Sequence, residues 1–428
     1  RPHVPGGADF VMHFWDKAAE LARLGKIQRF GFITTNSITQ TFSQRVLAHH
    51  MAAKKPVSLV MAIPDHPWRR KLKGHAMVRI AMTVGEAGQR AGRLHKVTAE
   101  RHLDSDTPEV DLDTREGRLW PDLTIGPNLA GAKALRANDS LCSPGVKLHG
   151  AGFIVTPRQA QNLGLGTVPG LEEHIKPYRN GRDLTAKPRG VMVIDLYPLE
   201  EAEVRQRFPA VYQHVADHVK PHREVNRDPF RREYWWWFGR RHTELRTFLD
   251  GLDRYIATVE TAKHRIFQFL DASVRPDNKL INVGLEDGLS LGVLSSRLHV
   301  TWAIAKGGRQ GVGNDPVYTK TQCFDTFPFP DPPARLRAGI GALAEELDAH
   351  RKARIEAHPH LTLTGLYNVL EKVRADAPLS PAERDVYDAG LVGTLRELHR
   401  DLDARVAEAY GWPAALSAEA VLARLVGL

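Results

Sequence analysis

Cysteine is scarce in this sequence, and long apolar runs are missing from it. The two cysteines, Cys142 and Cys323, are too few for a disulfide framework or a four-cysteine zinc site. No apolar run approaches the roughly 20 residues that a membrane-spanning helix needs. We therefore expect two reduced thiols, no metal centre and no membrane partner, in a cytoplasmic protein.

Charge of one sign is in excess. The chain has 59 Lys and Arg against 50 Asp and Glu, a net charge of +9 with neutral histidines, and this balance favours a polyanion as partner. The 428 residues suffice for two or three domains, and the apolar fraction of 42% is ordinary for a globular protein. The first residue is Arg1 and not Met, so we expect a fragment or a trimmed gene product.

Five elements are predicted in the first part of the chain. Apolar residues recur at helical spacing in 9–24, and a continuously apolar stretch at 30–35 predicts a strand covered on both faces. A helix is predicted at 40–53, followed by strands at 56–63 and 76–84. No helix separates the last two strands, so they are expected to pair as an antiparallel hairpin.

The remainder of the chain divides by composition. Residues 85–120 are polar and acidic and predict a linker, which we place at 96–119 after a first domain at 1–95. Residues 120–333 mix short strands and helices with glycine, proline and aromatics, as α+β domains do. Residues 334–428 carry amphipathic patterns rich in Ala, Leu, Arg and Glu, which predict a helical C-terminal domain.

The order helix, strand, helix, strand, strand resembles the second half of the sheet of class I S-adenosylmethionine-dependent methyltransferases. Several segments are similar to the MmeI-like family, in which an adenine-N6 DNA methyltransferase precedes a target recognition domain. They include "RFGFITTNSITQTF" (29–42), "IPDHPW" (63–68), "VRIAMTV" (78–84), "IKPYRNGRDL" (175–184), "RYIATVETAKHRIFQFLD" (254–271) and "CFDTFPFP" (323–330). The resemblance implies an α/β fold: half of a Rossmann-like sheet that ends in an antiparallel hairpin, then an α+β recognition domain and helices.

This resemblance implies a fragment of a site-specific methyltransferase that uses S-adenosylmethionine to methylate adenine N6 in double-stranded DNA, in restriction-modification or phage defence. The family's Phe-x-Gly-x-Gly loop and Asn-Pro-Pro-aromatic motif are both missing. The Gly-x-Gly in "LGLGTVPG" (163–170) follows no convincing strand. We therefore expect this chain alone to bind no cofactor, and a catalytically inactive DNA-binding specificity module is the alternative.

Candidate base-pocket residues follow from the same resemblance. Asn36 and Ser37 end a strand of the predicted sheet, where open α/β sheets bind ligands, although an Asn that turns the chain and caps a helix is the competing interpretation. Trp68 is a candidate for stacking on a flipped adenine, against a buried packing role. Asp65 and His66 flank it, and the alternative for both is a capped turn.

Two basic segments are candidates for DNA contact. The loop "RRKLKGH" (69–75) offers Arg69, Arg70 and Lys73 for contacts with phosphates, although a solvated basic loop has the same sequence pattern. The segment 220–246 interleaves basic residues with aromatics. There Trp236 is expected in the core, because three successive tryptophans cannot all face one way, and the alternative for the whole stretch is core with solvated arginines. The predicted phosphate contacts are Arg231, Arg232, Arg240 and Arg241.

Base reading is predicted near the end of the recognition domain. The resemblance places it in "KGGRQGVGNDPVYTKTQCF" (306–324), at Asn314, Asp315, Val317 and Lys320. The apolar Val317 cannot donate to a guanine edge, which leaves the base read there open. Nearby, "TVETAKHR" (258–265) offers Glu260, Lys263 and Arg265 to read or clamp DNA, or else to form structural salt bridges.

Overall fold

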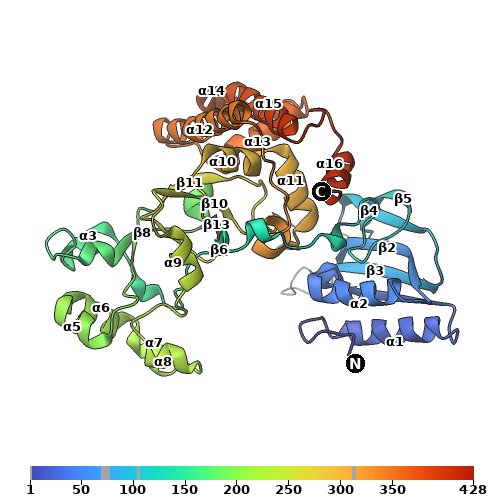
Figure 1. The fold of residues 1–428 in the computed structure, drawn as a ribbon, viewed down its shortest axis with the longest axis horizontal. Helices are drawn as coiled ribbons and strands as arrows, with labels where there is room; N and C mark the ends of the chain where they lie inside the picture. Colours follow the sequence, from blue (N-terminus) through green and yellow to red (C-terminus); the bar gives the residue numbers. More distant parts are fainter. Residues whose placement is uncertain (1, 69–77, 104–106, 311–314) are drawn as a thin grey trace. The chain divides into compact units, whose positions relative to one another are not determined.

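The computed structural model describes residues 2–68, 78–103, 107–310 and 315–428 (Figure 1). The chain divides into two compact units, each described here by itself. Unit 1 comprises Arg1–Ala132 and Ser417–Leu428, and unit 2 comprises Lys133–Leu416. Among the described residues, no helix is both long enough and apolar enough to cross a membrane.

Unit 1 is built on a five-stranded sheet in the order β1-β3-β2-β4-β5. The first three strands in this order are β1 (Arg29–Thr35), β3 (Val78–Ala87) and β2 (Val57–Trp68). Strand β3 runs antiparallel to both β1 and β2. The predicted order helix, strand, helix, strand, strand and the antiparallel pairing of the last two strands are therefore confirmed.

Two helices cover one face of this sheet, namely α1 (Val11–Arg23) and α2 (Thr41–Met51). The buried face of α1 follows from helical spacing, since Met12, Trp15 and Ala19 lie three or four residues apart and are fully buried. They pack with Phe30 of β1 in an edge-to-face contact of Trp15 with Phe30 at 5.3 Å between ring centroids. This layer is the core of unit 1.

Strand β1 lies at the edge of the sheet, and the prediction that it is covered on both faces is wrong. Phe30 and Thr34 are buried, but Ile33 between them is 58% exposed. In the described part of the chain β1 pairs with β3 alone. Exposed Phe10 and Phe14 of the α1 region add further uncovered apolar surface to this unit.

The predicted linker at 96–119 is instead part of the sheet. Strands β4 (Gly92–Arg101) and β5 (Glu109–Gly117) form an antiparallel pair, and β4 joins β2 in parallel. Polar cross-strand contacts hold this pair, among them the bidentate ion pair of Arg101 with Asp111 at 2.6 and 2.8 Å. Both strands expose most of their side chains, so an apolar alternation that would predict them is absent.

The boundary between the units also lies later than the predicted start of the second domain at residue 120. Leu119 and Leu123 are buried in the core of unit 1. Unit 1 therefore extends to Ala132, and helix α16 (Ala418–Val426) returns to it near the end of the chain. There Arg115 of β5 pairs with Glu419 at 2.9 Å.

Unit 2 has two four-stranded sheets and the predicted α+β character. The first, in the order β11-β10-β13-β6, consists of β11 (Gln268–Asp271), β10 (Arg254–Val259), β13 (Leu280–Val283) and β6 (Cys142–Pro144). The second, in the order β12-β8-β9-β7, consists of β12 (Arg275–Pro276), β8 (Ile175–Arg179), β9 (Met192–Ile194) and β7 (Ile154–Val155). Gly145 follows β6 and lies against the Pro276 and Asp277 carbonyls, so any side chain there would collide with backbone.

The predicted helices after residue 334 are present as α12 (Ala334–Ala357), α13 (Leu363–Arg374), α14 (Pro381–Gly390) and α15 (Val392–Ala409). They do not form a separate domain. Gly292 of α10 (Gly288–Ser295) lies so close to Ile340 of α12 and Leu402 of α15 that a larger residue would not fit. Buried Arg351 of α12 donates to the Phe267 carbonyl at 2.8 Å, so these helices are part of unit 2.

Candidate nucleic-acid interface

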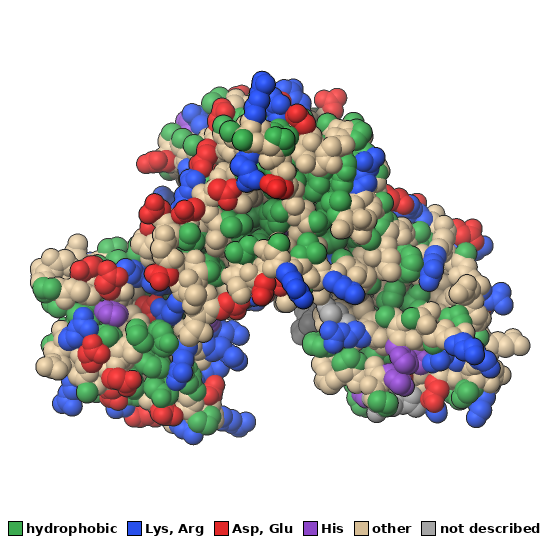
Figure 2. Space-filling model, viewed as in Figure 1, with side chains coloured by type: hydrophobic (Ala, Val, Ile, Leu, Met, Phe, Trp, Pro, Cys, Tyr) green, Lys and Arg blue, Asp and Glu red, His purple; other side chains and the backbone are tan. Residues whose placement is uncertain are grey.

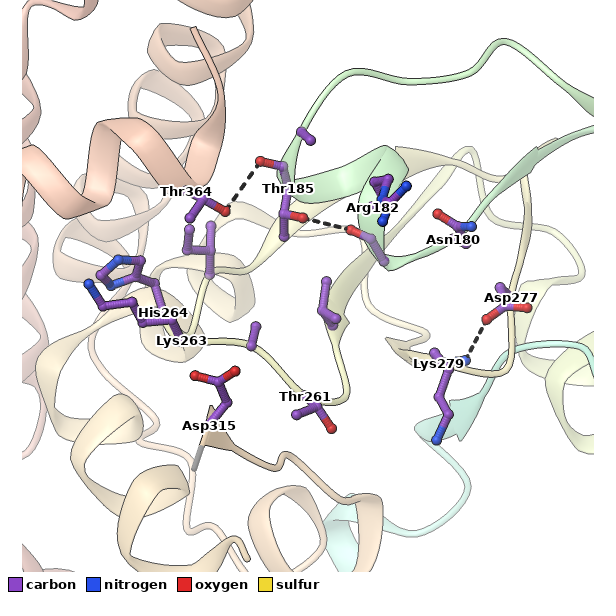
Figure 3. Close-up of a pocket in the computed structure, with 15 residues that line it drawn as sticks. Asn180, Arg182, Thr185, Thr261, Lys263, His264, Asp277, Lys279, Asp315 and Thr364 are labelled. Carbon is purple, nitrogen blue, oxygen red and sulfur yellow. Dashed lines mark hydrogen bonds between the residues drawn. The ribbon is translucent and has the colours of Figure 1, made fainter. Parts of the chain in front are cut away.

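A cleft of about 620 Å³ opens in unit 2 (Figure 3). Its walls come from five places: the short helix α4 (Gly181–Thr185) with its flanking residues, the segment 259–266, Asp277 and Lys279 before β13, Asp315 of β15 (Asp315–Pro316), and Thr364 of α13. The cleft thus brings together two predicted reading residues, Lys263 and Asp315, which lie far apart in the sequence. Both basic and acidic side chains line it.

Arg265 lies beneath this cleft and not in it. Its side chain is buried, with 8% of the residue exposed, and burial lowers the pKa of its guanidinium to about 10. It donates to the Thr258 hydroxyl at 3.1 Å, to the Val259 carbonyl, to the Glu260 carbonyl at 3.3 Å and to the Pro316 carbonyl at 3.0 Å. The prediction that Arg265 reads or clamps DNA is therefore wrong, and its role is structural.

The bonds of Arg265 join two backbone segments. Ala262 also donates its N–H to the Pro316 carbonyl at 3.3 Å, and Tyr318 donates its N–H to the Glu260 carbonyl at 2.7 Å. An isolated antiparallel bridge pairs Thr261 with Val317. The segment that carries Asp315 is thus fixed to the end of β10 through main-chain atoms.

Glu260 and Lys263, also predicted to read or clamp DNA, form ion pairs, as the alternative interpretation expected. Glu260 accepts from Lys279 at 2.5 Å. Lys263 donates to Asn368 at 2.7 Å and pairs with Glu371 at 3.3 Å, both on α13. These are exposed pairs, which stabilise a protein by about 1 kcal/mol or less, so neither pair removes its members from reach of a ligand.

The structure describes only part of the segment 306–324. Asn314 lies outside the described residues. Asp315 faces the cleft, and Val317 is half-buried in its bridge with Thr261. Lys320 pairs with Glu244 of α9 (Thr243–Leu249), and although partial burial lowers its pKa, this carboxylate raises it above the ordinary value.

The aromatic and basic segment 220–246 places its aromatics inside. Trp235, Trp236 and Trp237 are all buried, and the last two donate their indole N–H groups to the Leu199 carbonyl at 2.9 and 3.0 Å. The core position predicted for Trp236 is confirmed. The expectation that its neighbours face elsewhere is wrong, because the turn after α8 (Pro229–Glu233) folds all three rings into one cluster.

The arginines around this cluster remain on the surface to different degrees. Figure 2 shows Lys and Arg, interspersed with Asp and Glu, over the visible face of the lobe of α5 (Glu201–Arg207), α6 (Pro209–His218), α7 (Lys220–Glu224) and α8. Arg240 and Arg241 are exposed, and Arg241 lies over the Tyr234 ring at 5.5 Å. Arg231 pairs with Asp228 at 3.2 Å, and Arg232 donates to the Asn226 carbonyl at 2.6 Å.

Arg246, in the same segment, has a buried partner. It binds Asp195 through two bonds of 2.7 Å each, and Arg275 adds a third at 3.1 Å. Burial raises the pKa of Asp195, but the two guanidiniums outweigh it and hold the pKa below its ordinary value. This triad ties α9 to the sheet and thereby fixes the segment in place.

In unit 1, Asn36 and Ser37 lie in the 3₁₀ turn after β1. The Asn36 side chain does not cap α2, whose cap position is Gln40. Ser37 donates its hydroxyl to Asp9 at 2.6 Å, and this bond lowers the pKa of Asp9. The capping interpretation is therefore wrong for Asn36, while a place in a base pocket stays a prediction.

Trp68 ends β2 and is 43% exposed. The alternative of a buried packing tryptophan is therefore wrong. Asp65 pairs with Arg79 of β3 at 2.5 Å, and His66 donates its ring Nδ1–H to the Pro67 carbonyl at 2.8 Å. Asp65 is thus engaged within the sheet, and the predicted contacts Arg69, Arg70 and Lys73 lie outside the described residues.

The lining residues that the sequence did not predict include Asn180, Arg182 and Lys279. A sequence signal existed for the first two. In "NGRDL" Asn180 and Asp183 form a capping box, each side chain bonding the other's backbone N–H. This pattern starts a helix at Gly181, but nothing in the sequence predicts that Arg182 and Asp315 line the same cleft.

Comparison with known proteins finds a similar family for part of unit 2. Residues 145–331 match the family described as "MmeI, target recognition domain". A solved structure of the type IIL restriction-modification enzyme MmeI in complex with DNA resembles the chain with a TM-score of 0.72 at 18% identity, over 99% of this chain and 53% of that chain. The type IIG restriction endonuclease BpuSI gives a TM-score of 0.30 at 12% identity, over 96% and 51% of the two chains, which is too low to support any conclusion.

No curated protein matches the chain. The chain spans about half the length of the two solved chains, and the likeness to the MmeI structure shows a shared fold. The family match covers the tryptophan cluster and most of the residues that line the cleft. Residues 145–331 are therefore similar to the target recognition domain of MmeI.

Proposed function

We propose that this chain is part of a site-specific adenine DNA methyltransferase, in which unit 2 reads the sequence of double-stranded DNA and unit 1 supplies the rear of the pocket for the target base. The family match of residues 145–331 carries this proposal. The DNA in the matched MmeI structure supports the choice of ligand. The net charge of +9 suits the same partner.

Unit 1 supports the methyltransferase part of the proposal through its sheet. The antiparallel pair of β2 and β3 is the hairpin that the resemblance to class I methyltransferases implied. Asn36 follows the carboxyl end of β1, and Trp68 offers an exposed indole at the end of β2. A base that has left the helical stack needs such a ring to stack on and an amide to bond its edge.

The surroundings of the Gly-x-Gly sequence support the expectation that this chain alone does not hold S-adenosylmethionine. The Gly-x-Gly of Gly164 and Gly166 follows helix α3 (Pro157–Asn162) and not a strand, and Val168 fills the space beside Gly164. We therefore assign the cofactor to the complete enzyme and derive no step of methyl transfer from this chain. What this chain contributes is recognition and the placement of the base.

A DNA-binding specificity module without catalysis is the second candidate, and the missing cofactor loop favours it. The DNA sequence upstream of the codon for Arg1 separates the two. An in-frame Asn-Pro-Pro-aromatic motif and a Gly-x-Gly strand turn there would support the enzyme. A start codon close to Arg1 with neither motif would support the module.

The DNA-binding part is tested by titrating the chain against a labelled duplex at increasing salt. We expect the affinity to fall steeply, because binding displaces counterions from the phosphates. No binding at low salt, or binding that is insensitive to salt, would contradict a DNA role. Exchanging Asp315 and Val317 in the complete enzyme tests base reading, since methylation sequencing should then report an altered site.

A further inference from the structure

Arg182 lines the cleft, and among the described residues its side chain has no hydrogen-bond or ion-pair partner. Of the other two basic side chains that line it, Lys279 bonds Glu260 and Lys263 bonds Asn368 and Glu371. Within the described ranges, the Arg182 side chain is exposed and makes no hydrogen bond or ion pair. A guanidinium has five donors in a fixed fork, and all of them are available here to a ligand.

The backbone that carries Arg182 is held firmly. Asn180 and Asp183 cap the start of α4 reciprocally, and buried Asp183 binds Arg189 at 2.8 and 3.0 Å. The Thr185 carbonyl accepts the Thr364 hydroxyl of α13 at 3.4 Å (Figure 3). Because these bonds fix α4 at both ends, the exposed Arg182 side chain extends from a fixed backbone.

The acceptors in the cleft distinguish two kinds of DNA contact. A surface that only neutralises phosphates needs donors, whereas base edges present donors and acceptors together. Asp315 lines the same cleft, and among the described residues its carboxylate has no hydrogen-bond or ion-pair partner. A carboxylate of this kind would repel phosphate but accepts the amino group of a cytosine or adenine edge.

We infer that Arg182 reads a base edge in the major groove together with Asp315, with guanine as the base that its fork fits. Guanine O6 and N7 accept two parallel bonds from one guanidinium. This inference rests on the proposed DNA-binding function and deepens it. It adds a specificity-determining residue from α4, a different part of the chain from the segment 306–324.

The test begins with selection of bound duplexes from a randomised library by the chain of 428 residues. The selected duplex and a scrambled duplex of equal composition are then titrated with the unaltered chain, with R182A and with the control R335A. Arg335 is an exposed arginine of α12 outside the cleft. We expect R182A to weaken the selected duplex about 5- to 150-fold, and to lose preference for one G·C pair.

The expected pattern also requires that R182A leave the scrambled duplex and the salt dependence unchanged, and that R335A behave as the unaltered chain. Equal weakening of both duplexes, with a salt slope smaller by about one, would make Arg182 a phosphate contact and overturn the inference. Unchanged binding by R182A would also overturn it. Binding without any selected sequence would overturn base reading but leave DNA binding intact, and absence of binding at low salt would remove the proposed function itself.

Discussion

Among the described residues, the buried guanidinium of Arg265 is surrounded by carbonyl oxygens and one hydroxyl and by no carboxylate. The Tyr318 ring lies below it at 5.1 Å. A cation in this position is held by main-chain dipoles and by the ring. Its removal leaves buried acceptors without donors, which gives a direct test of its structural role.

We expect R265M to lower the free energy of unfolding by about 3 kcal/mol, because several buried oxygens lose their donors at once. Urea unfolding followed by tryptophan fluorescence measures it. The control K263M breaks only the exposed bonds of Lys263 to α13 and should cost about 0.5 kcal/mol. Equal midpoints for R265M and the unaltered chain would contradict the assigned role.

We expect the stability of unit 2 to depend on pH through Asp403 of α15. Its Oδ1 accepts the Arg297 backbone N–H at 2.6 Å, and burial raises its pKa to about 6. The unfolded value is about 3.9, so the folded chain holds the proton more tightly. The stability that this carboxyl contributes is therefore present at pH below about 4 and is lost as pH rises through about 6.

We expect D403N to become more stable relative to the unaltered chain as pH rises from 4.5 to 7, since the amide cannot ionise. Urea unfolding midpoints at pH 4.5, 5.5 and 7 report this difference. The exposed neighbour Asp401 supplies the control D401N. Parallel pH curves for D403N and the unaltered chain would show that the Asp403 carboxyl does not titrate as described.

At the scale of elements, sequence periodicity predicted the amphipathic helices and missed strands that are polar or short. Helix α1 was predicted at 9–24 and lies at Val11–Arg23, because its buried face repeats over several turns. Strands β4 and β5 were missed because polar pairs hold them together. Many strands of unit 2 have two to four residues, and a period of two cannot be recognised over that length.

The exposed edge of strand β1 leads to a prediction about self-association. It pairs on one side only within the described chain and exposes Ile33, and such edges add strands from other copies. We expect the chain to self-associate as its concentration rises, and I33K to shift it toward monomer in sedimentation velocity. The control L24K changes an exposed leucine away from the sheet. Identical sedimentation of I33K and the unaltered chain would refute edge pairing.

At the scale of the whole molecule, the sequence did not predict the geometry of the cleft. The family resemblance predicted base reading in the segment 306–324, which stays a prediction, and Asp315 of this segment lines a cleft. Arg182 could not be found in this way, because its place in the same cleft as Asp315 depends on the packing of α4 against β10 and α13. Arg265 could not be assigned either, since only burial distinguishes a reader from a support.

Because the sequence lacks the cofactor loop, we make a prediction for this chain of 428 residues. Titration of S-adenosylmethionine in a calorimeter should give no binding heat above that of dilution. An active adenine methyltransferase titrated in parallel is the positive control. A dissociation constant in the micromolar range would show that the described residues can hold the cofactor after all, and would overturn the interpretation of Gly164 and Gly166.

The attachment of the segment around Asp315 has one more consequence. Arg265 binds the Pro316 carbonyl of this segment and the Val259 and Glu260 carbonyls at the end of β10, and every amino acid possesses such a carbonyl, so the grip does not depend on side chains. Side chains at 260, 315 and 317 can therefore be exchanged while the grip persists. Under the proposed function, substitutions at these three positions would change the groups offered to DNA and leave the main-chain attachment intact.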